Sequence, residues 1–430
     1  MPRHNLSPSL IARFFHHECQ RFLRYSAVPR ADRRALGIPD AVEEHTQVSE
    51  LLTAKGLAWE DEVVGRKIPG LVHMAPGGGA YHDRRFSAEE SLRVLSSMAA
   101  GSGAYQATLI VPPSFYRRYG LDPEVCSFHE CRPDLIWCLP DREGRLLRVI
   151  DLKATDSLKT SHRIQVGLYA LILDAAIADG GISAVADRNS AGIWLQDADT
   201  PEILTIGTDL QVLEHFLADE LGKIMAAPPA SLPWHLQPKC EQCPFYLSCR
   251  REAEESGSVS LIPGLTAGGR QFLRDGAGVE TLHDLDRFLS SPGADEALEA
   301  CGSLRGKGEV LRRQVRAVRE GTVVPLDGAS PSLPVNESVG VIITLQREPV
   351  GGRICAAGFR RFKGKDIYDA PSREWIGVAA GEEECGAVAG GFVQALYDEL
   401  AVLSAYNEGK AFAEQRSLQT YVTDLSLIHI

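Results

Sequence analysis

Two aspartates and a lysine fall on what the sequence predicts to be one β-hairpin. The stretches PDLIWCL (133–139) and LLRVIDLKA (146–154) have the composition of strands, and PDREG (140–144) between them is typical of a turn. Antiparallel pairing would bring Asp134 beside Asp151, and Lys153 would share their face because side chains alternate along a strand. Paired carboxylates repel each other unless a divalent cation lies between them. A neighbouring lysine can orient or deprotonate a water and stabilise charge that develops on a phosphate.

A helix is predicted after this hairpin, and it carries Gln165 and Tyr169 one turn apart. Both lie on the flank of an apolar stripe made of Ile164, Leu168, Leu171, Ile172 and Ala175. Such a helix can pack on the hairpin while it offers two polar groups to the acidic residues. Upstream, residues 48–64 form another helical run, which contains Gly56 and Glu60.

The ordered set Pro133-Asp134, Asp151-x-Lys153 and Gln165-x3-Tyr169 resembles the RecB-like branch of the PD-(D/E)xK nuclease superfamily. That branch carries an upstream GxxxH or GxxxE helix, which Gly56-x3-Glu60 fits, with glutamate in place of the commoner histidine. His73 and His82 are alternatives for this position. As an isolated residue, Glu60 also fits an exposed helix carboxylate beside Asp61 and Glu62.

The resemblance implies a metal-dependent nuclease and assigns a role to each residue of the set. Mg²⁺ or Mn²⁺ would be held by Glu60, Asp134, Asp151 and the backbone carbonyl of Leu152. Lys153 would position the attacking water, and Gln165 and Tyr169 would support the lysine or the scissile strand.

Four cysteines form a second constellation. Cys240-x2-Cys243-x5-Cys249 reads as part of a metal site that lacks its other half, and Cys19 near the N-terminus is a plausible fourth thiolate. This pattern resembles the iron-sulfur members of the RecB-like branch, such as the AddB and CRISPR-adaptation nucleases, and so implies a structural 4Fe-4S cluster on these four residues. Zinc in the same four thiolates is the alternative. Cys126 and Cys131, which flank His129, are expected to be buried thiols instead.

We expect an α/β protein of several domains. Residues 1–255 would form the nuclease, with a mixed central sheet flanked by helices in a restriction-endonuclease-like core. Residues 256–325 would form a small helical module in which 261–289 resemble a helix-hairpin-helix unit, and residues 336–424 a truncated RNase H-like α/β region. This last region has Thr344 and Gln346 where such exonucleases carry acids. Residues 425–430 (LSLIHI) read as a cloning or sequencing artefact.

Composition narrows the function classes. The chain of 430 residues has 45 basic and 57 acidic side chains, a net charge of −12, which argues against a protein that coats nucleic acid by bulk charge. Local basic clusters remain at 1–34, which holds seven arginines, and at 305–319. We expect a cytoplasmic protein without a membrane span, because there is no apolar stretch of bilayer length and no export signal. No Walker A sequence occurs.

The sequence therefore predicts a DNA nuclease, most simply a single-strand exonuclease, that belongs to a longer DNA repair protein or complex with a helicase domain or subunit. The alternative from another class is a catalytically silent, nuclease-like module that binds DNA or supports assembly of a helicase complex. The complete acid-acid-lysine set speaks against this alternative, because a module that only binds has little reason to keep buried like charges.

Overall fold

The structure, a computed structural model, describes residues 4–41, 47–68, 71–72, 87–141, 144–324, 337–347 and 352–422. The alternative ligands His73 and His82 and the segment 425–430 lie outside the described residues. The chain forms two compact units, residues 1–45 with 53–326 and residues 46–52 with 327–430. Both units combine mixed or antiparallel sheets with helices, so the expected α/β class is confirmed. The predicted domain boundaries stay a prediction.

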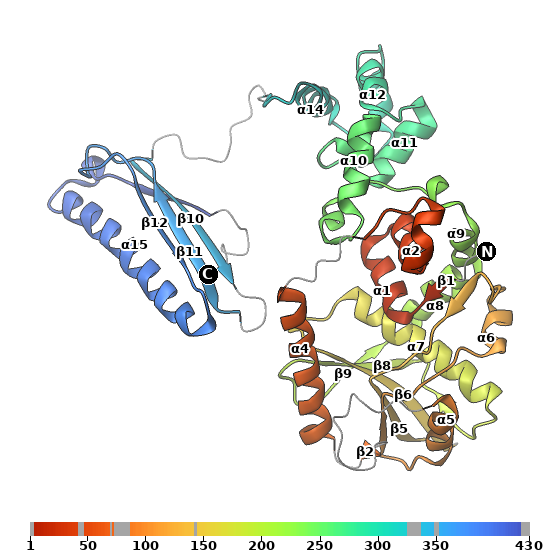
Figure 1. The fold of residues 1–430 in the computed structure, drawn as a ribbon. Helices are drawn as coiled ribbons and strands as arrows, with labels where there is room; N and C mark the ends of the chain where they lie inside the picture. Colours follow the sequence, from red (N-terminus) through yellow and green to blue (C-terminus); the bar gives the residue numbers. More distant parts are fainter. Residues whose placement is uncertain are drawn as a thin grey trace. The chain divides into compact units, whose positions relative to one another are not determined.

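A mixed sheet forms the centre of the first unit (Figure 1). Its strand order is β2-β3-β5-β6-β8-β9, and β7 also pairs with β6. The β2–β3, β6–β7 and β6–β8 pairs are parallel, whereas β3–β5, β5–β6 and β8–β9 are antiparallel. The strands are β2 (Leu71–Val72), β3 (Gly103–Tyr105), β5 (Leu135–Asp141), β6 (Gly144–Lys153), β7 (Val185–Ala186), β8 (Ser190–Leu195) and β9 (Glu202–Thr205).

The predicted hairpin is confirmed as the antiparallel pair β5–β6. Its strands run further toward the turn than the sequence suggested, since Asp141 still pairs with Gly144. At the other end Leu135 pairs with Ile150, which brings the preceding Asp134 level with the following Asp151.

Helices cover both faces of this sheet. The predicted helix after the hairpin is α7 (Thr160–Asp179), and it packs with the side chains of Leu147 and Val149 from β6. The other face carries Ile150 and Leu152, which pack with α4 (Gln47–Glu62) and the π-helical turn η2 (Val63–Lys67). Because side chains alternate along β6, Asp151 and Lys153 belong to the α7 face.

Helix α7 is buried over most of its circumference, more widely than the apolar stripe indicated. It is covered in turn by α1 (Pro8–His17) and α8 (Gly207–His215). The close approach of α8 requires a glycine, because a Cβ on Gly167 would lie 3.0 Å from the side chain of Leu213. Burial by neighbouring helices, which sequence periodicity does not report, explains the difference.

Further elements of this unit surround the sheet and the first helices. They are β1 (His4–Leu6), α2 (Gln20–Ala27), α3 (Arg30–Arg33), η1 (Arg34–Leu36), α5 (Ala88–Ser97), α6 (Pro113–Arg118), β4 (Cys126–Phe128), η3 (Phe216–Leu221), α9 (Gly222–Ala226), η4 (Pro229–Ser231), η5 (Pro238–Gln242) and α10 (Tyr246–Ser256). Strands β1 and β4 form a separate parallel pair.

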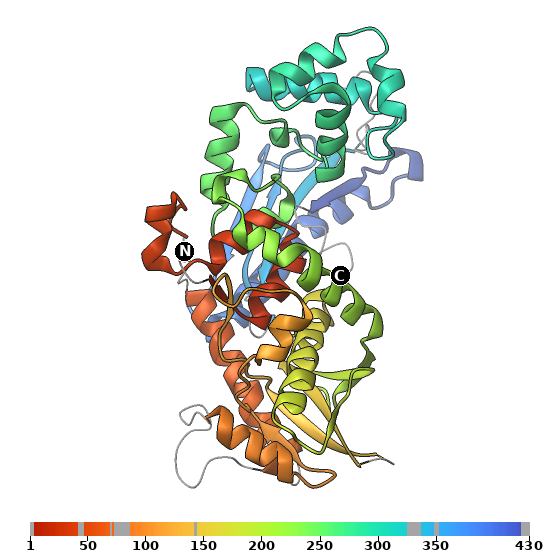
Figure 2. The same ribbon diagram turned by 90° about the vertical axis from the view of Figure 1, so that its right-hand side faces the viewer.

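The predicted helical segment after residue 260 is confirmed as a small bundle with its own apolar core, coloured green to cyan (Figure 1, Figure 2). It contains η6 (Val259–Leu261), α11 (Ala267–Ala277), α12 (Leu282–Leu289), α13 (Ala294–Glu299) and α14 (Gly308–Glu320). Its basic cluster is largely neutralised within the bundle, by the ion pairs Arg305–Glu299, Arg312–Asp295, Arg313–Glu309 and Arg319–Asp286.

The second unit is a four-stranded sheet with one long helix (Figure 1). The strand order is β12-β11-β10-β13, and only the β10–β13 pair is parallel. Its elements are β10 (Val339–Arg347), β11 (Ile354–Arg361), β12 (Arg373–Val378), η7 (Glu382–Glu384), α15 (Cys385–Asn407), η8 (Phe412–Glu414) and β13 (Leu418–Val422). Strands β10 and β11 form an antiparallel hairpin, and β13 pairs with the other edge of β10.

No helix within the described ranges is both long and apolar enough to cross a membrane.

Candidate active site

The hairpin brings its two aspartates and its lysine into direct contact. Asp134 precedes β5, and Asp151 and Lys153 end β6, so all three lie at one edge of the sheet. A hydrogen bond joins the carboxyl groups of Asp134 and Asp151. Lys153 Nζ lies 2.7 Å from Oδ2 of Asp151, whose side chain is 1% exposed. The expected neighbourhood of these three side chains is therefore present.

Asp134 holds a proton more tightly than an ordinary aspartate. Burial raises the pKa of this carboxyl well above its usual range, and the negative charge of Asp151 raises it further, while Lys153 opposes both effects. Its Oδ2 accepts a hydrogen bond of 2.7 Å from the backbone N–H of Leu152. The backbone amide of Leu152 therefore binds Asp134. The role of the Leu152 carbonyl as a metal ligand stays a prediction.

Lys153 is a cation in this setting. Burial alone would lower its pKa, but the charges of Asp151 and Asp134 and the hydrogen bond to Asp151 outweigh burial and raise the pKa above the usual value. A lysine of raised pKa cannot take a proton from water at neutral pH. A charged Lys153 can orient a water and offset negative charge. Orienting the water therefore fits this lysine, whereas deprotonating the water does not.

Glu60 is brought to the cluster by α4, and it is half-buried rather than exposed as Asp61 and Glu62 are. Its carboxylate oxygen Oε2 accepts a hydrogen bond of 2.8 Å from the hydroxyl of Tyr105 and one of 3.3 Å from Nε2 of Gln106. The charge of Glu60 acts on both Asp134 and Lys153. Position 60 is therefore part of the same electrostatic cluster.

Tyr105 and Gln106 were not found by sequence reasoning. Gln106 adopts a left-handed backbone with φ of 51° directly after β3, and its N–H donates to the Asp134 carbonyl at 2.8 Å. The adjacent amide and phenol therefore link Glu60 to the backbone at Asp134. The only signal in the sequence is a Tyr-Gln pair at the end of a very short strand, which is weak.

Gln165 and Tyr169 approach from α7. The side chains hydrogen-bond to each other. Burial raises the pKa of the Tyr169 phenol, and the charges of Asp151 and Asp134 add to this effect.

His162, at the start of α7, also escaped the sequence analysis. It is 8% exposed, and burial, followed by the charge of Lys153, lowers its pKa to about 4. Its Nδ1 accepts a hydrogen bond of 3.3 Å from the N–H of Lys159, so the neutral ring carries its proton on Nε2. This ring adds a neutral group, and no positive charge, beside Lys153.

The donor set around the hairpin suits a hard divalent cation. Asp134, Asp151 and Glu60 supply only oxygen ligands, which Mg²⁺ and Mn²⁺ prefer, and Lys153 is the single cation among them. Oδ2 of Asp151 is buried without a well-oriented hydrogen bond from any described residue, although Lys153 is close to it. Within the described residues, no group of three or more His, Cys, Asp or Glu side chains is arranged so that it could hold a metal ion.

The four cysteines of the second constellation line one cavity. Cys19 lies between α1 and α2, Cys240 in η5, Cys243 directly after it, and Cys249 in α10. The N-terminal segment is also held there by other contacts, since Arg21 forms an ion pair of 2.6 Å with Glu252.

Each of these four thiols has a raised pKa. Burial raises the pKa of Cys243 to about 12 and that of Cys249 to about 11, and the neighbouring cysteines raise both further. The pKa values of Cys19 and Cys240 are raised for the same first reason. Four thiols that resist ionisation together fit a site whose thiolates form when a positive metal centre binds. The donor set suits an iron-sulfur cluster or zinc equally well.

The other predicted cysteines lie elsewhere. Cys126 and Cys131 are 0% and 1% exposed, which confirms that they are buried thiols, and His129 between them is exposed.

No protein-family model matches the chain, and no curated protein matches its sequence.

Proposed function

We propose that this protein is a Mg²⁺- or Mn²⁺-dependent deoxyribonuclease that hydrolyses phosphodiester bonds, acting on single strands as an exonuclease. The excess of carboxylates over cations around the hairpin carries this proposal. Three acids meet one lysine, and burial and the charge of Asp151 raise the pKa of Asp134 well above its usual range. An arrangement of this kind is costly for folding and is explained by a cation that replaces the proton.

The residues divide the chemistry among themselves. When bound, the divalent ion would polarise the phosphate and lower the pKa of a water. Asp134, Asp151 and Glu60 would hold it, while the charged Lys153 would orient the attacking water and offset charge on the phosphate oxygens. Tyr169 and Gln165 would support the lysine or the strand, and Tyr105 and Gln106 would keep Glu60 directed at the cluster.

The cysteine cavity supports a structural 4Fe-4S cluster on Cys19, Cys240, Cys243 and Cys249, with zinc as the rival. Its ligands come from segments more than 200 residues apart, so the metal centre would fix the N-terminal helices to the segment that follows α9. Anaerobic purification separates the two: a cluster gives a brown protein with visible absorbance, whereas zinc gives a colourless one.

The remaining parts fit a larger nucleic-acid enzyme. The hairpin flanked by α4 and α7 supports a restriction-endonuclease-like core. Helices α11 and α12, joined by a short turn at Gly278, support a helix-hairpin-helix unit. The strand order of the second unit supports an RNase H-like region, in which Thr344 and Gln346 on β10 replace the expected acids and argue against catalysis there. A helicase domain or subunit would be the partner in a DNA repair complex.

The decisive experiment compares Asp151→Ala and Lys153→Ala with the unchanged protein on an end-labelled single strand, with and without Mg²⁺ or Mn²⁺. Each substitution should abolish metal-dependent cleavage while DNA binding and the visible absorbance are retained. Cleavage at the unchanged rate in either variant would refute the assignment. A protein that binds the strand but never cleaves it, with any divalent ion, would instead support the silent nuclease-like module.

A further inference from the structure

A second polar cavity lies beside the cysteine cavity and has no part in the cluster at the hairpin. Its walls come from the turn between α1 and α2, from the segment 232–237, and from one face of α11. Cys19, Trp234 and His235 line both cavities, so the two share a wall. The residues that give it chemical character are Gln20, Trp234, Arg270, Gln271 and Arg274.

Arg270 is the unusual member of this wall. It is half-buried and has no ion pair with any carboxylate in the described part of the chain. Its Nη1 donates to the backbone carbonyl of Trp234. Burial lowers the pKa of this arginine, and the charge of Arg274 lowers it further. A partly desolvated guanidinium without a counter-charge is a position that an anion would stabilise.

The surrounding charges favour an anion as well. Arg274 follows Arg270 by one helical turn on α11, so both side chains face the same cavity. Glu18 also lines the cavity, but it lies 3.5 Å from Lys239; Asp275 lies 3.0 Å from Arg274, so Arg270 is the arginine of this wall without a carboxylate partner among the residues that the structure describes, and Glu280 acts on it only through its charge. In a chain whose net charge is −12, this cavity is a locally basic site.

The aromatic ring in the wall narrows the class of anion. Trp234 lines the cavity and Arg270 binds its carbonyl, while the guanidinium of Arg21, 4% exposed and paired with Glu252, lies 4.4 Å from its ring centroid. A tryptophan beside arginines such as Arg270 and Arg274 is typical of surfaces that bind a nucleic-acid strand, where guanidinium groups contact phosphate and aromatic rings contact bases. A carboxylate peptide would use the charge but not the ring.

We infer that this cavity is a binding site for the phosphodiester backbone of a nucleic-acid strand, with Arg270 and Arg274 as its phosphate ligands. The inference rests on the proposed nuclease function for the identity of the ligand and assigns the strand a contact outside the catalytic cluster. It explains why Arg270, unlike Arg312, Arg313 and Arg319 of α14, has no carboxylate partner among the described residues.

The test is strand binding by the full chain in the presence of EDTA, so that cleavage plays no part. A fluorescent single-stranded oligonucleotide is titrated by anisotropy at several salt concentrations against Arg270→Gln, Arg274→Gln and, as a matched loss of one charge, Arg305→Gln on the exposed Arg305–Glu299 pair. Arg270→Gln should weaken binding about tenfold and reduce the salt dependence by about one counterion. Arg305→Gln should change binding less than twofold, and Arg270→Lys should recover part of the loss.

Arg274→Gln provides a second test in case Arg270→Gln disturbs the segment around Trp234, because Arg274 does not bind the Trp234 carbonyl. Arg274→Gln should weaken strand binding several-fold. Equal binding in Arg274→Gln and Arg305→Gln would overturn the inference. So would competition by a polyglutamate peptide as strong as that by an unlabelled strand, or competition by inorganic phosphate alone. If Arg270→Gln loses binding and no divalent ion supports cleavage, the proposed nuclease function fails while this site stands.

Discussion

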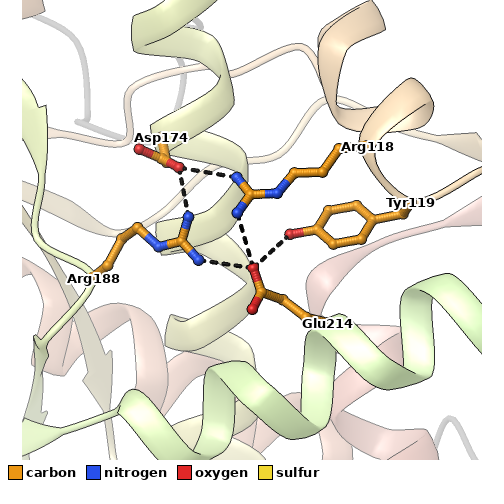
Figure 3. A network of polar contacts seen from close by, with 5 residues as sticks. All are labelled: Arg118, Tyr119, Asp174, Arg188 and Glu214. Atoms are coloured by element: carbon orange, nitrogen blue, oxygen red, sulfur yellow. Dashed lines mark hydrogen bonds and ion pairs between the residues drawn. The ribbon is translucent and has the colours of Figure 1, made fainter.

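Two polar clusters lie along helix α7, one with balanced charges and one with an excess of acids. Toward its C-terminal half, Asp174 joins Glu214, Arg118 and Arg188 in a network of two acids and two arginines (Figure 3). Arg188 lies 3.0 Å from Asp174 and 2.7 Å from Glu214, and the Tyr119 hydroxyl donates to Glu214 at 3.3 Å. In its N-terminal half, Tyr169, hydrogen-bonded to Gln165, lies within the field of Asp134 and Asp151, which with Glu60 and Lys153 form the hairpin cluster.

The two clusters differ in what they need from outside the protein. In the Arg118–Arg188 network each acid has two arginine partners, so every charge is compensated within the protein and the network joins α6, α7 and α8. In the hairpin cluster three carboxyl groups meet one lysine, so negative charge remains even when Asp134 is protonated, and a bound cation would compensate it. A balanced network stabilises a fold, whereas an unbalanced one stores an electrostatic cost that a ligand can relieve.

The largest expected effect is that of removing the divalent ion. Chelation with EDTA should lower cleavage by more than about a thousand-fold, because the site then lacks the charge that activates water and phosphate. Added Mg²⁺ or Mn²⁺ should restore the rate and raise the melting temperature. Glu214→Gln, in the balanced network, should retain both responses. Full cleavage activity in excess EDTA would show that the hairpin cluster, like the Arg118–Arg188 network, does not need a divalent ion.

Neutralising one acid in each cluster should change stability in opposite directions. Asp134→Asn replaces a carboxyl whose raised pKa makes proton uptake on folding costly at neutral pH, so it should stabilise the metal-free protein by about 1–2 kcal/mol while it abolishes cleavage. Glu214→Gln removes the partner of two arginines and should destabilise by about 1 kcal/mol with cleavage retained. Urea unfolding in EDTA measures both. Destabilisation by Asp134→Asn would show that its carboxylate is satisfied without a cation.

The phenol of Tyr105 should matter for the cation more than for the fold. Tyr105→Phe removes the hydrogen bond that directs Glu60, so cleavage should fall about tenfold and a higher Mg²⁺ concentration should be needed for half-maximal rate. Tyr119→Phe removes an equivalent hydrogen bond to Glu214 and serves as the control. An unchanged Mg²⁺ requirement in Tyr105→Phe would mean that Glu60 does not help to hold the ion.

The smallest expected effect is on the pH dependence of stability. The pKa of Asp134 is raised in the folded state, so its protonation stabilises the fold. This contribution to the free energy of unfolding is complete below about pH 4, the ordinary aspartate pKa, and is lost as pH rises through the folded pKa. Between these two pKa values the metal-free protein should therefore lose stability relative to Asp134→Asn. Saturating Mg²⁺ should remove the difference. Parallel pH profiles of the two proteins in EDTA would contradict a raised pKa at this position.

Local patterns in the sequence were sufficient to predict several elements. Strand-like composition on either side of the turn PDREG predicted the hairpin, and the apolar spacing after it predicted α7, because both depend on residues close together in the chain. Pairing of the two strands then brings Asp134 and Asp151 together through a short connection. The sequence did not indicate that α7 is enclosed by α1 and α8, since that burial depends on segments distant in sequence.

Charge compensation was the hardest feature to predict. The basic cluster at 305–319 looked free in sequence, but four of its arginines pair with acids brought close by folding. Arg270 gave no signal of its own, yet it is an arginine without a carboxylate partner among the described residues. The sequence gives the number of charged side chains, whereas the distances between them in the folded chain decide which of them form ion pairs.

By itself, the sequence determined the β5–β6 hairpin, the helix that follows it, and the pairing by which two aspartates and a lysine come to share one edge of a sheet. The tertiary structure alone decided that Glu60 is oriented by Tyr105 and Gln106, that the pKa of Asp134 is raised, and that four cysteines line one cavity. The physical reason is that backbone periodicity is a local property, whereas burial and electrostatic fields arise from segments that only folding brings together.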